Sequence, residues 1–218
     1  MEKNELAASL DFWLSLSFIS TLLTPLIGLI RYAKLSKFQR HVLNLAILIL
    51  VNETVTYFMR EFEWNNMWVF HLFNPLLVYL ILMIYREVLE KFKVKAFKVT
   101  VVLYLAFSAV NTFLIQGINN LNTNAIVSSG VLFIILSIMC FYQFLSDKVV
   151  SSRGKVAVIW FNSGVLLHYS ATLILFFFVN NILTGRSDFL MLTWKLNVLL
   201  TVLLHICYSV SLWVKQKD

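Results

Sequence analysis

The chain has 218 residues, of which 60% are hydrophobic and only 13% are charged, and its formal net charge is +7. Soluble globular proteins contain about 25% charged residues, so this composition excludes a soluble domain and indicates an integral membrane protein. The two cysteines, Cys140 and Cys207, lie within hydrophobic stretches, which excludes a disulfide framework. The basic residues form short patches between apolar runs, so the net charge reports orientation in a membrane and not binding to nucleic acid.

A helix needs about 20 mostly apolar residues to cross about 30 Å of hydrocarbon. Seven stretches of the sequence meet this requirement: residues 10–30, 41–59, 67–85, 99–116, 125–145, 156–180 and 190–213. The connections between them are short, so neighbouring helices are expected to be antiparallel. The sequence therefore predicts an all-α fold, in which residues 1–218 form a single transmembrane domain built as a seven-helix bundle.

The connections between these stretches divide the basic residues unevenly. The first, third and fifth connections and the C-terminal tail contain 4, 5, 3 and 2 lysines and arginines, which is 14 of the 18 in the chain. The other side has only Lys3, Arg60 and Arg186, and Lys195 falls within a stretch. Basic connections are typically retained in the cytoplasm, so we expect the N-terminus outside and the C-terminus in the cytoplasm.

The last stretch carries a polar stripe. At a helical turn of about 100° per residue, Trp194, Asn197, Thr201, His205 and Tyr208 fall on one face, and nearly all the remaining residues are aliphatic. Such a face is costly against lipid and must contact protein or water. Two interpretations remain open: the stripe forms hydrogen bonds between helices, or it lines a cavity that binds a ligand.

Polar side chains of other stretches also gather, for the most part, between the outer surface and the middle of the membrane. Counting about 1.5 Å per residue from the helix ends places Asn162 and His205 deeper than the rest. Together with four residues of the stripe, these side chains make up the predicted ligand pocket: Glu53, His71, Asn74, Asn162, His168, Tyr169, Trp194, Lys195, Asn197, Thr201 and His205.

Glu53 and Lys195 are the carboxylate and the amine placed furthest inside the predicted helices. An unpaired charge at that depth costs about 2.5–3.5 kcal/mol. One hypothesis is that both share an aqueous vestibule with His71, either as an ion pair or as two contacts to one ligand. The alternative is that each side chain extends to the outer surface. Lys195 lies about 160° from Asn197 around the helix, which favours the alternative for this residue.

Motifs of known chemistry are missing from the sequence. It contains no Walker loop, no HExxH or GxSxG pattern and no Cys/His spacing typical of a metal site. We therefore assign no catalytic residue, no cofactor and no metal, and an enzyme is the less favoured interpretation of the sequence.

The last third of the chain contains a distinctive pattern. It consists of Phe161, Asn162, Ser163 and Gly164 in the sixth stretch, Tyr169 and Ser170 one or two turns later, and Asn197 in the last stretch. This pattern resembles a family of uncharacterised small seven-span integral membrane proteins of Bacteroidota. The resemblance implies a multi-pass protein of the bacterial inner (cytoplasmic) membrane that acts as a sensory or signalling module associated with sensor histidine kinases.

The expected function is thus signal perception through an outward-facing polar pocket, with the signal passed to a separate cytoplasmic or membrane partner. A small solute transporter or channel is the first alternative, and a membrane-embedded lipid-modifying enzyme is the second. The basic connections are expected to contact anionic lipid headgroups, and docking of a partner protein is their other interpretation. A homo-oligomer is compatible with the sequence, and nucleic acid is not an expected partner.

Overall fold

The computed structural model describes residues 2–90, 92, 94–146, 152–182 and 187–215, with side chains described outside residues 2–11, 14, 152–154 and 176–191. The described residues form seven α-helices, one 3-10 turn and one π-helical turn, and they include no strand. The elements are α1 (Glu2–Ile30), η1 (Tyr32–Lys34), α2 (Lys37–Glu61), α3 (Met67–Val88), α4 (Val94–Val110), η2 (Asn111–Ile115), α5 (Thr123–Ser146), α6 (Ser152–Ile182) and α7 (Ser187–Trp213).

Six of the predicted stretches fall within one of these helices, and most of these helices extend beyond the stretch. The predicted stretch 99–116 instead spans the end of α4, the π-helical turn η2 and Gln116. α2 begins at Lys37, four residues earlier than predicted, because Ser36 and Gln39 form a capping box. The Ser36 hydroxyl accepts from the Gln39 amide N–H at 3.3 Å, and the Gln39 side chain accepts from the Ser36 amide at 3.1 Å. Such a box pairs backbone donors that the first helical turn leaves free, and it fixes the start of the helix.

Length and composition make six helical segments of the described chain able to cross a membrane. Their bounds are Lys37–Glu61, Met67–Val88, Val94–Ile115, Thr123–Ser146, Lys155–Leu175 and Leu192–Trp213. The apolar part of α1, Ser15–Ile30, is shorter. These six helices indicate a multi-pass membrane protein, and the prediction of an all-helical bundle is confirmed to that extent.

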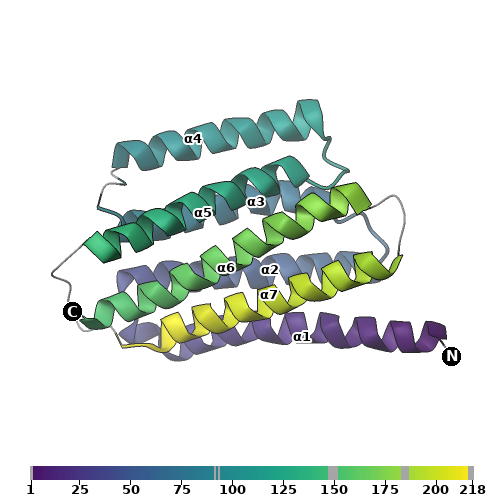
Figure 1. Ribbon diagram of the computed structural model, residues 1–218, viewed down its shortest axis with the longest axis horizontal. Helices are drawn as coiled ribbons and strands as arrows, with labels where there is room; N and C mark the ends of the chain where they lie inside the picture. The colour runs from purple at the N-terminus through teal and green to yellow at the C-terminus, as the bar shows by residue number, and fades with distance from the viewer. Residues whose placement is uncertain (1, 91, 93, 147–151, 183–186, 216–218) are drawn as a thin grey trace.

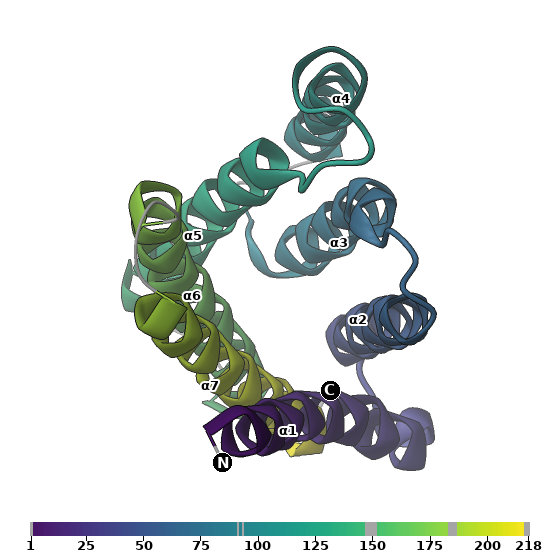
Figure 2. The same cartoon turned by 90° about the vertical axis from the view of Figure 1, so that its right-hand side faces the viewer.

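The helices run along one common direction, and α1 begins at the opposite end of the bundle from where α7 ends (Figure 1). Seen from one end, α1, α2, α3, α5, α6 and α7 follow one another around a ring, which closes where α1 packs against α7 (Figure 2). α4 lies outside this ring and packs against α3. The ring therefore brings α2 and α3 opposite α6 and α7, which are far apart in the sequence.

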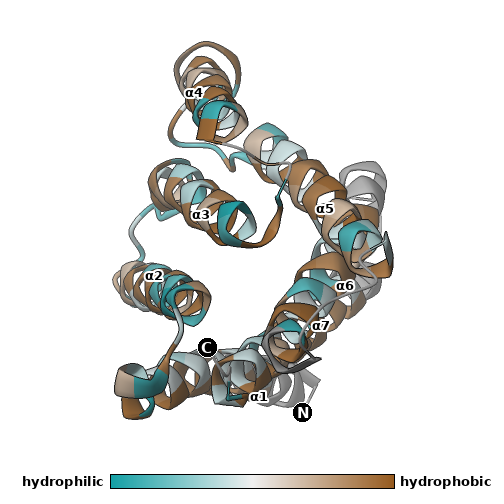
Figure 3. Cartoon of the chain, turned by 90° about the vertical axis from the view of Figure 1, so that its left-hand side faces the viewer, coloured by the Kyte–Doolittle hydropathy of each residue, from teal (hydrophilic) through white to brown (hydrophobic). Residues whose placement is uncertain are grey.

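One end of the bundle, which we call the basic end, holds the end of α1, the starts of α2, α4 and α6, and the ends of α3, α5 and α7. Figure 3 looks onto this end and shows hydrophilic residues near it, while the flanks of the helices are mainly hydrophobic. The Lys37 ammonium and the Glu87 carboxylate form an ion pair of 2.9 Å that joins α2 to α3 there. Gln39 donates to the backbone carbonyls of Ser211 and Val214, both at 2.8 Å, and so joins α2 to α7.

Aromatic side chains fill the half of the bundle nearest the basic end. The rings of Phe161 and Tyr208 are stacked with their centroids 5.1 Å apart, and both side chains are fully buried. Phe38 meets Phe161 edge-on at 5.7 Å, and Tyr85 lies 6.0 Å from the same ring. These contacts join α2, α3, α6 and α7 in one apolar core, and they close the interior of the ring on this side.

Candidate functional site

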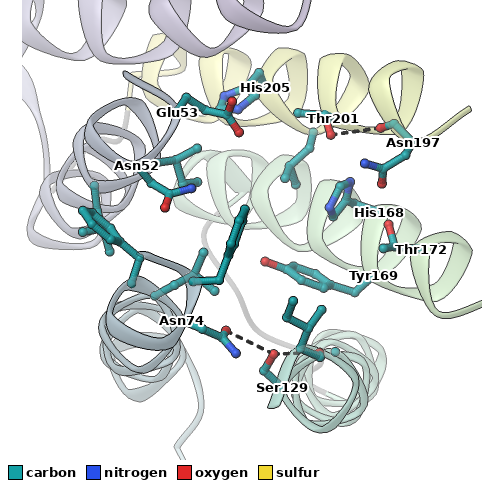
Figure 4. A pocket seen from close by; sticks show the side chains of 18 of the residues that line it. Asn52, Glu53, Asn74, Ser129, His168, Tyr169, Thr172, Asn197, Thr201 and His205 are labelled. Atoms are coloured by element: carbon teal, nitrogen blue, oxygen red, sulfur yellow. Dashed lines mark hydrogen bonds between the residues drawn. The ribbon is translucent and has the colours of Figure 1, made fainter. Parts of the chain in front are cut away.

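The interior of the ring is hollow in the half away from the basic end. There a partly open cavity of about 240 Å³ is lined by residues of α2, α3, α5, α6 and α7 (Figure 4). Its polar lining consists of Asn52, Glu53, Asn74, Ser129, His168, Tyr169, Thr172, Asn197, Thr201 and His205. Its apolar lining consists of Leu48, Ile49, Phe70, Phe73, Leu77, Ile126, Gly130, Leu173 and Leu204.

Seven of the eleven predicted pocket residues line this cavity. They are Glu53, Asn74, His168, Tyr169, Asn197, Thr201 and His205. The spacing of Asn197, Thr201 and His205 on α7 places all three on one face, as the polar stripe requires. The stripe therefore has both of the roles that the sequence left open, because its middle faces the cavity while His205 also forms hydrogen bonds to another helix.

The His205 ring is held by two threonines of α1. The Thr24 hydroxyl lies 3.1 Å from Nδ1, and the Thr21 hydroxyl lies 3.3 Å from Nε2. Thr24 also lies 3.1 Å from the Ser209 hydroxyl, one turn further along α7. Since both ring nitrogens have partners and the side chain is 1% exposed, His205 joins α1 to α7 and offers the cavity only its carbon edge.

His71 does not line the cavity, so the predicted vestibule shared by Glu53, Lys195 and His71 is wrong. Its Nε2 lies 2.9 Å from the Asn120 carbonyl, which only accepts, so this nitrogen carries the proton. Its Nδ1 then accepts from the Thr112 hydroxyl at 2.8 Å. His71 thus joins α3 to the π-helical turn η2 and to the connection that follows it.

Trp194 and Lys195 also lie outside the cavity, and both side chains are half-buried. Within the described residues, Lys195 forms no ion pair with Glu53. Its position follows from helix geometry, since it lies nearly opposite Asn197, which faces the cavity.

Asn162, the remaining predicted pocket residue, lies closer to the basic end than the cavity and belongs to a closed hydrogen-bond network. The Tyr85 hydroxyl donates to Asn162 Oδ1 at 2.7 Å and lies 2.6 Å from the Ser137 hydroxyl. The Asn162 amide donates to the Ser137 carbonyl at 3.0 Å. All three side chains are at most 1% exposed, so the network joins α3, α5 and α6 and has no ligand-facing atom.

A second network holds one wall of the cavity in place. The Asn74 amide donates to the Tyr104 hydroxyl at 3.0 Å, and Tyr104 donates to the Ala125 carbonyl at 2.9 Å. Ser129 lies 3.5 Å from Asn74 Oδ1 (Figure 4). These bonds tie α3 to α4 and α5, and they fix the direction of Asn74 at the edge of the cavity.

Other polar atoms of the cavity wall have no hydrogen-bond partner within the described residues. Asn52 Oδ1, His168 Nδ1 and Thr172 Oγ1 are buried and unpartnered. The Tyr169 hydroxyl points toward the middle of the cavity and also forms no hydrogen bond in the described part of the chain (Figure 4). Buried polar groups are normally paired, so unpaired atoms gathered around one hollow are typical of a site that is completed by a ligand or by water.

Glu53 supplies the one charged side chain among the described residues that line the cavity. Its carboxylate forms neither an ion pair nor a hydrogen bond within the described residues. Arg60, two turns further along α2, lies with its guanidinium 5.3 Å from the centre of the Tyr57 ring and not against Glu53. The carboxylate therefore faces the cavity without a fixed partner.

Three polar lining residues were missed among the predicted pocket residues: Asn52, Ser129 and Thr172. Thr172 follows His168 by one helical turn, so the spacing of four residues could have indicated a shared face. Ser129 carries no comparable signal, because hydroxyls in apolar helices commonly bond to their own backbone, as Ser129 does to Ile126 at 2.9 Å. Comparison of the chain with family models, curated proteins and solved structures found no match.

Proposed function

We propose that this protein is an integral membrane sensory or signalling module. A small ligand binds in the cavity from the outer side, and the bundle passes the signal to a separate cytoplasmic or membrane partner. In this proposal all seven helices cross the bacterial inner membrane, the N-terminus is outside and the basic end faces the cytoplasm. The observation that carries the proposal is a polar cavity in one half of the bundle and a sealed aromatic core in the other.

The geometry of α7 supports a route for the signal. α7 contributes Asn197 and Thr201 to the cavity. The Ser211 carbonyl in its last turn and the Val214 carbonyl just after the helix accept hydrogen bonds from Gln39 of α2. The Arg31 guanidinium also donates to the Leu212 carbonyl at 3.1 Å. A ligand that favours one position of α7 would therefore also change the contacts of α1 and α2 at the basic end. Such a shift requires different ligand affinities for the two states of the bundle.

A transporter is the first alternative. It requires that solvent reach the cavity from the basic end in a second conformation. In the present structure the stacked rings of Phe161 and Tyr208 fill that path. A lipid-modifying enzyme, the second alternative, requires a carboxylate and a histidine in hydrogen-bond contact. Glu53 forms no such bond, and both nitrogens of His205 are held by α1.

Co-purification from native membranes in a mild detergent tests the sensory proposal. We expect a histidine kinase or another signalling protein to be enriched with the wild-type chain. The double variant Lys95→Gln/Lys98→Gln removes two exposed charges at the basic end and should reduce this enrichment. Arg60→Gln removes an exposed charge at the opposite end and is the matched control. Recovery of the protein alone, together with solute uptake by liposomes that contain it, would contradict the proposal and favour the transporter.

A further inference from the structure

The charge of the cavity favours a cationic ligand. Glu53 faces the cavity without a partner, and Glu61 and Glu63 are exposed at the same end of the bundle. Arg60 is the cation closest along the chain, and its guanidinium is directed to the Tyr57 ring. A carboxylate at membrane depth is costly unless an opposite charge or hydrogen-bond donors satisfy it. A ligand that brings a positive charge would remove this cost.

The unpartnered atoms of the wall favour a ligand rich in hydrogen-bond donors. Asn52 Oδ1 can only accept a hydrogen bond. His168 Nδ1 has no hydrogen-bond partner within the described residues, and it is an acceptor when the neutral ring carries its proton on Nε2. The Thr201 hydroxyl donates a hydrogen bond to the Asn197 carbonyl at 2.9 Å, so its oxygen lone pairs remain free to accept a hydrogen bond from a ligand. The hydroxyls of Tyr169 and Thr172 can either donate or accept a hydrogen bond.

The remaining wall favours an organic body over a bare metal ion. Within the described residues no group of three or more His, Cys, Asp or Glu side chains is placed to hold a metal. The apolar lining includes Phe70, Phe73 and Leu77 of α3. Aromatic rings favour both apolar groups and cations. The volume of about 240 Å³ lies below the usual range for drug-sized ligands, so the occupant must be small.

We propose that the cavity binds a small protonated amine that carries an apolar or aromatic body. The ammonium group contacts the Glu53 carboxylate and the acceptors of Asn52 and His168, and the body lies against the phenylalanines of α3. This inference rests on the proposed function, since it names the chemical class of the ligand that the sensory cavity receives. Charge complementarity sets the preference for an amine over an alcohol of the same shape.

A series of three probes on the wild-type protein tests this preference without any substitution. The full chain in lipid nanodiscs is dialysed against radiolabelled 2-phenylethylamine, 2-phenylethanol or phenylacetate, and empty nanodiscs correct for partition into lipid. We expect saturable binding of the amine, binding of the alcohol at least about tenfold weaker, and no binding of the anion, because a charged hydrogen bond is stronger than a neutral one. Equal binding of amine and alcohol, or preference for the anion, overturns the proposal.

Three substitutions test whether Glu53 supplies the charge that binds the amine. Glu53→Gln keeps the shape of the side chain and should weaken amine binding at least about tenfold while leaving the alcohol unaffected. Glu61→Gln removes an exposed carboxylate outside the cavity and should leave amine binding unchanged. Asn52→Asp adds a carboxylate next to the first and should strengthen amine binding. Unchanged amine affinity in a folded Glu53→Gln protein contradicts the assignment, and the probe series decides the question if the variants do not fold.

Failure of the ligand assignment can be told apart from failure of the sensory function. Absence of amine binding, with a signalling partner still recovered from membranes, removes the ligand class and leaves the function. Amine binding accompanied by uptake of 2-phenylethylamine into liposomes keeps the ligand class and replaces the sensor with a transporter. Inhibition of amine binding by sodium or potassium chloride at equal ionic strength, without such inhibition by choline chloride, would identify an inorganic cation as the occupant instead.

Discussion

The two halves of the bundle place their buried polar groups in different surroundings. In the half near the basic end, Tyr85, Ser137 and Asn162 satisfy one another in a closed network across three helices. In the other half, His168 Nδ1 and Thr172 Oγ1 belong to residues that line a hollow, and they have no partner within the described residues. A membrane interior offers no water to unpaired groups, so closed networks stabilise packing and open ones are costly. The first half is therefore built for stability, and the second has the features of a binding site.

The comparison is not absolute, since the Tyr208 hydroxyl, His41 Nε2 and Ser211 Oγ lie in the half near the basic end without a partner in the described part of the chain. These exceptions make the comparison testable. If pairing is what stabilises the sealed half, substitutions there should follow the hydrogen bonds of each residue and not merely its burial. Substitutions around the cavity should instead leave stability almost unchanged and alter ligand binding.

The largest effect on stability is expected for Asn162→Ala. The change removes the acceptor of the Tyr85 hydroxyl and the donor to the Ser137 carbonyl, and it leaves a void in a fully buried position. We expect the free energy of unfolding in mixed detergent micelles to fall by about 2–3 kcal/mol. Asn197→Ala, which removes an amide from the cavity wall, is the matched control and should cost less than about 1 kcal/mol. Equal losses would mean that the two halves do not differ in this way.

A second, smaller effect concerns the close approach of α6 and α7 at Gly164. A Cβ at this position would lie 2.7 Å from the Cβ of Cys207, which belongs to a rigid part of its side chain. At Gly130, which lines the cavity, the nearest atom is 3.3 Å away at the mobile end of Leu173. We expect Gly164→Ala to cost about 1–2 kcal/mol after the gain in helix propensity, and Gly130→Ala to be close to neutral. Thermal unfolding of the two variants in one detergent compares them directly.

A matched pair of tyrosines separates burial from pairing. Tyr85 and Tyr208 are both fully buried and both lie against the ring of Phe161. Tyr85→Phe leaves groups of Ser137 and Asn162 unpaired and should cost about 1 kcal/mol. Tyr208→Phe removes a hydroxyl without a partner in the described residues and should be neutral or stabilising. A loss of stability for Tyr208→Phe as large as that for Tyr85→Phe would show that burial alone explains the effect.

The sequence predicted the helices and part of the cavity for identifiable reasons. Long apolar runs can only be satisfied as helices in lipid, so each helix could be located from composition alone. The regular spacing of Asn197, Thr201 and His205 predicted a common face, and the structure has one. The spacing within α1 carried an unused signal, because Thr21 and Thr24 lie three residues apart and both face His205.

The remaining placements depend on packing that the sequence does not encode locally. His71 lies in α3 as expected, but its partner Thr112 belongs to a π-helical turn, and that turn has no recognised sequence signal. Asn162 has the same polarity as Asn197, yet it faces Tyr85 because α6 contacts α3 and α5 at that level. Depth can thus be counted along a helix, whereas direction requires the neighbouring helices. For this reason Glu53 and Lys195 could not be assigned as a pair or as separate residues before the fold was known.

The smallest expected effect on stability is that of Glu53→Gln, which bears most directly on the difference between the halves. The carboxylate has no partner within the described residues, so its replacement by a neutral amide of the same shape breaks no contact. Removal of an unpaired charge at membrane depth is also favourable. We expect the unfolding free energy to change by less than about 0.5 kcal/mol or to rise, as measured in ligand-free detergent solution. A marked loss of stability would mean that Glu53 stabilises the bundle. The residues around the cavity would then serve packing, as those in the half near the basic end do.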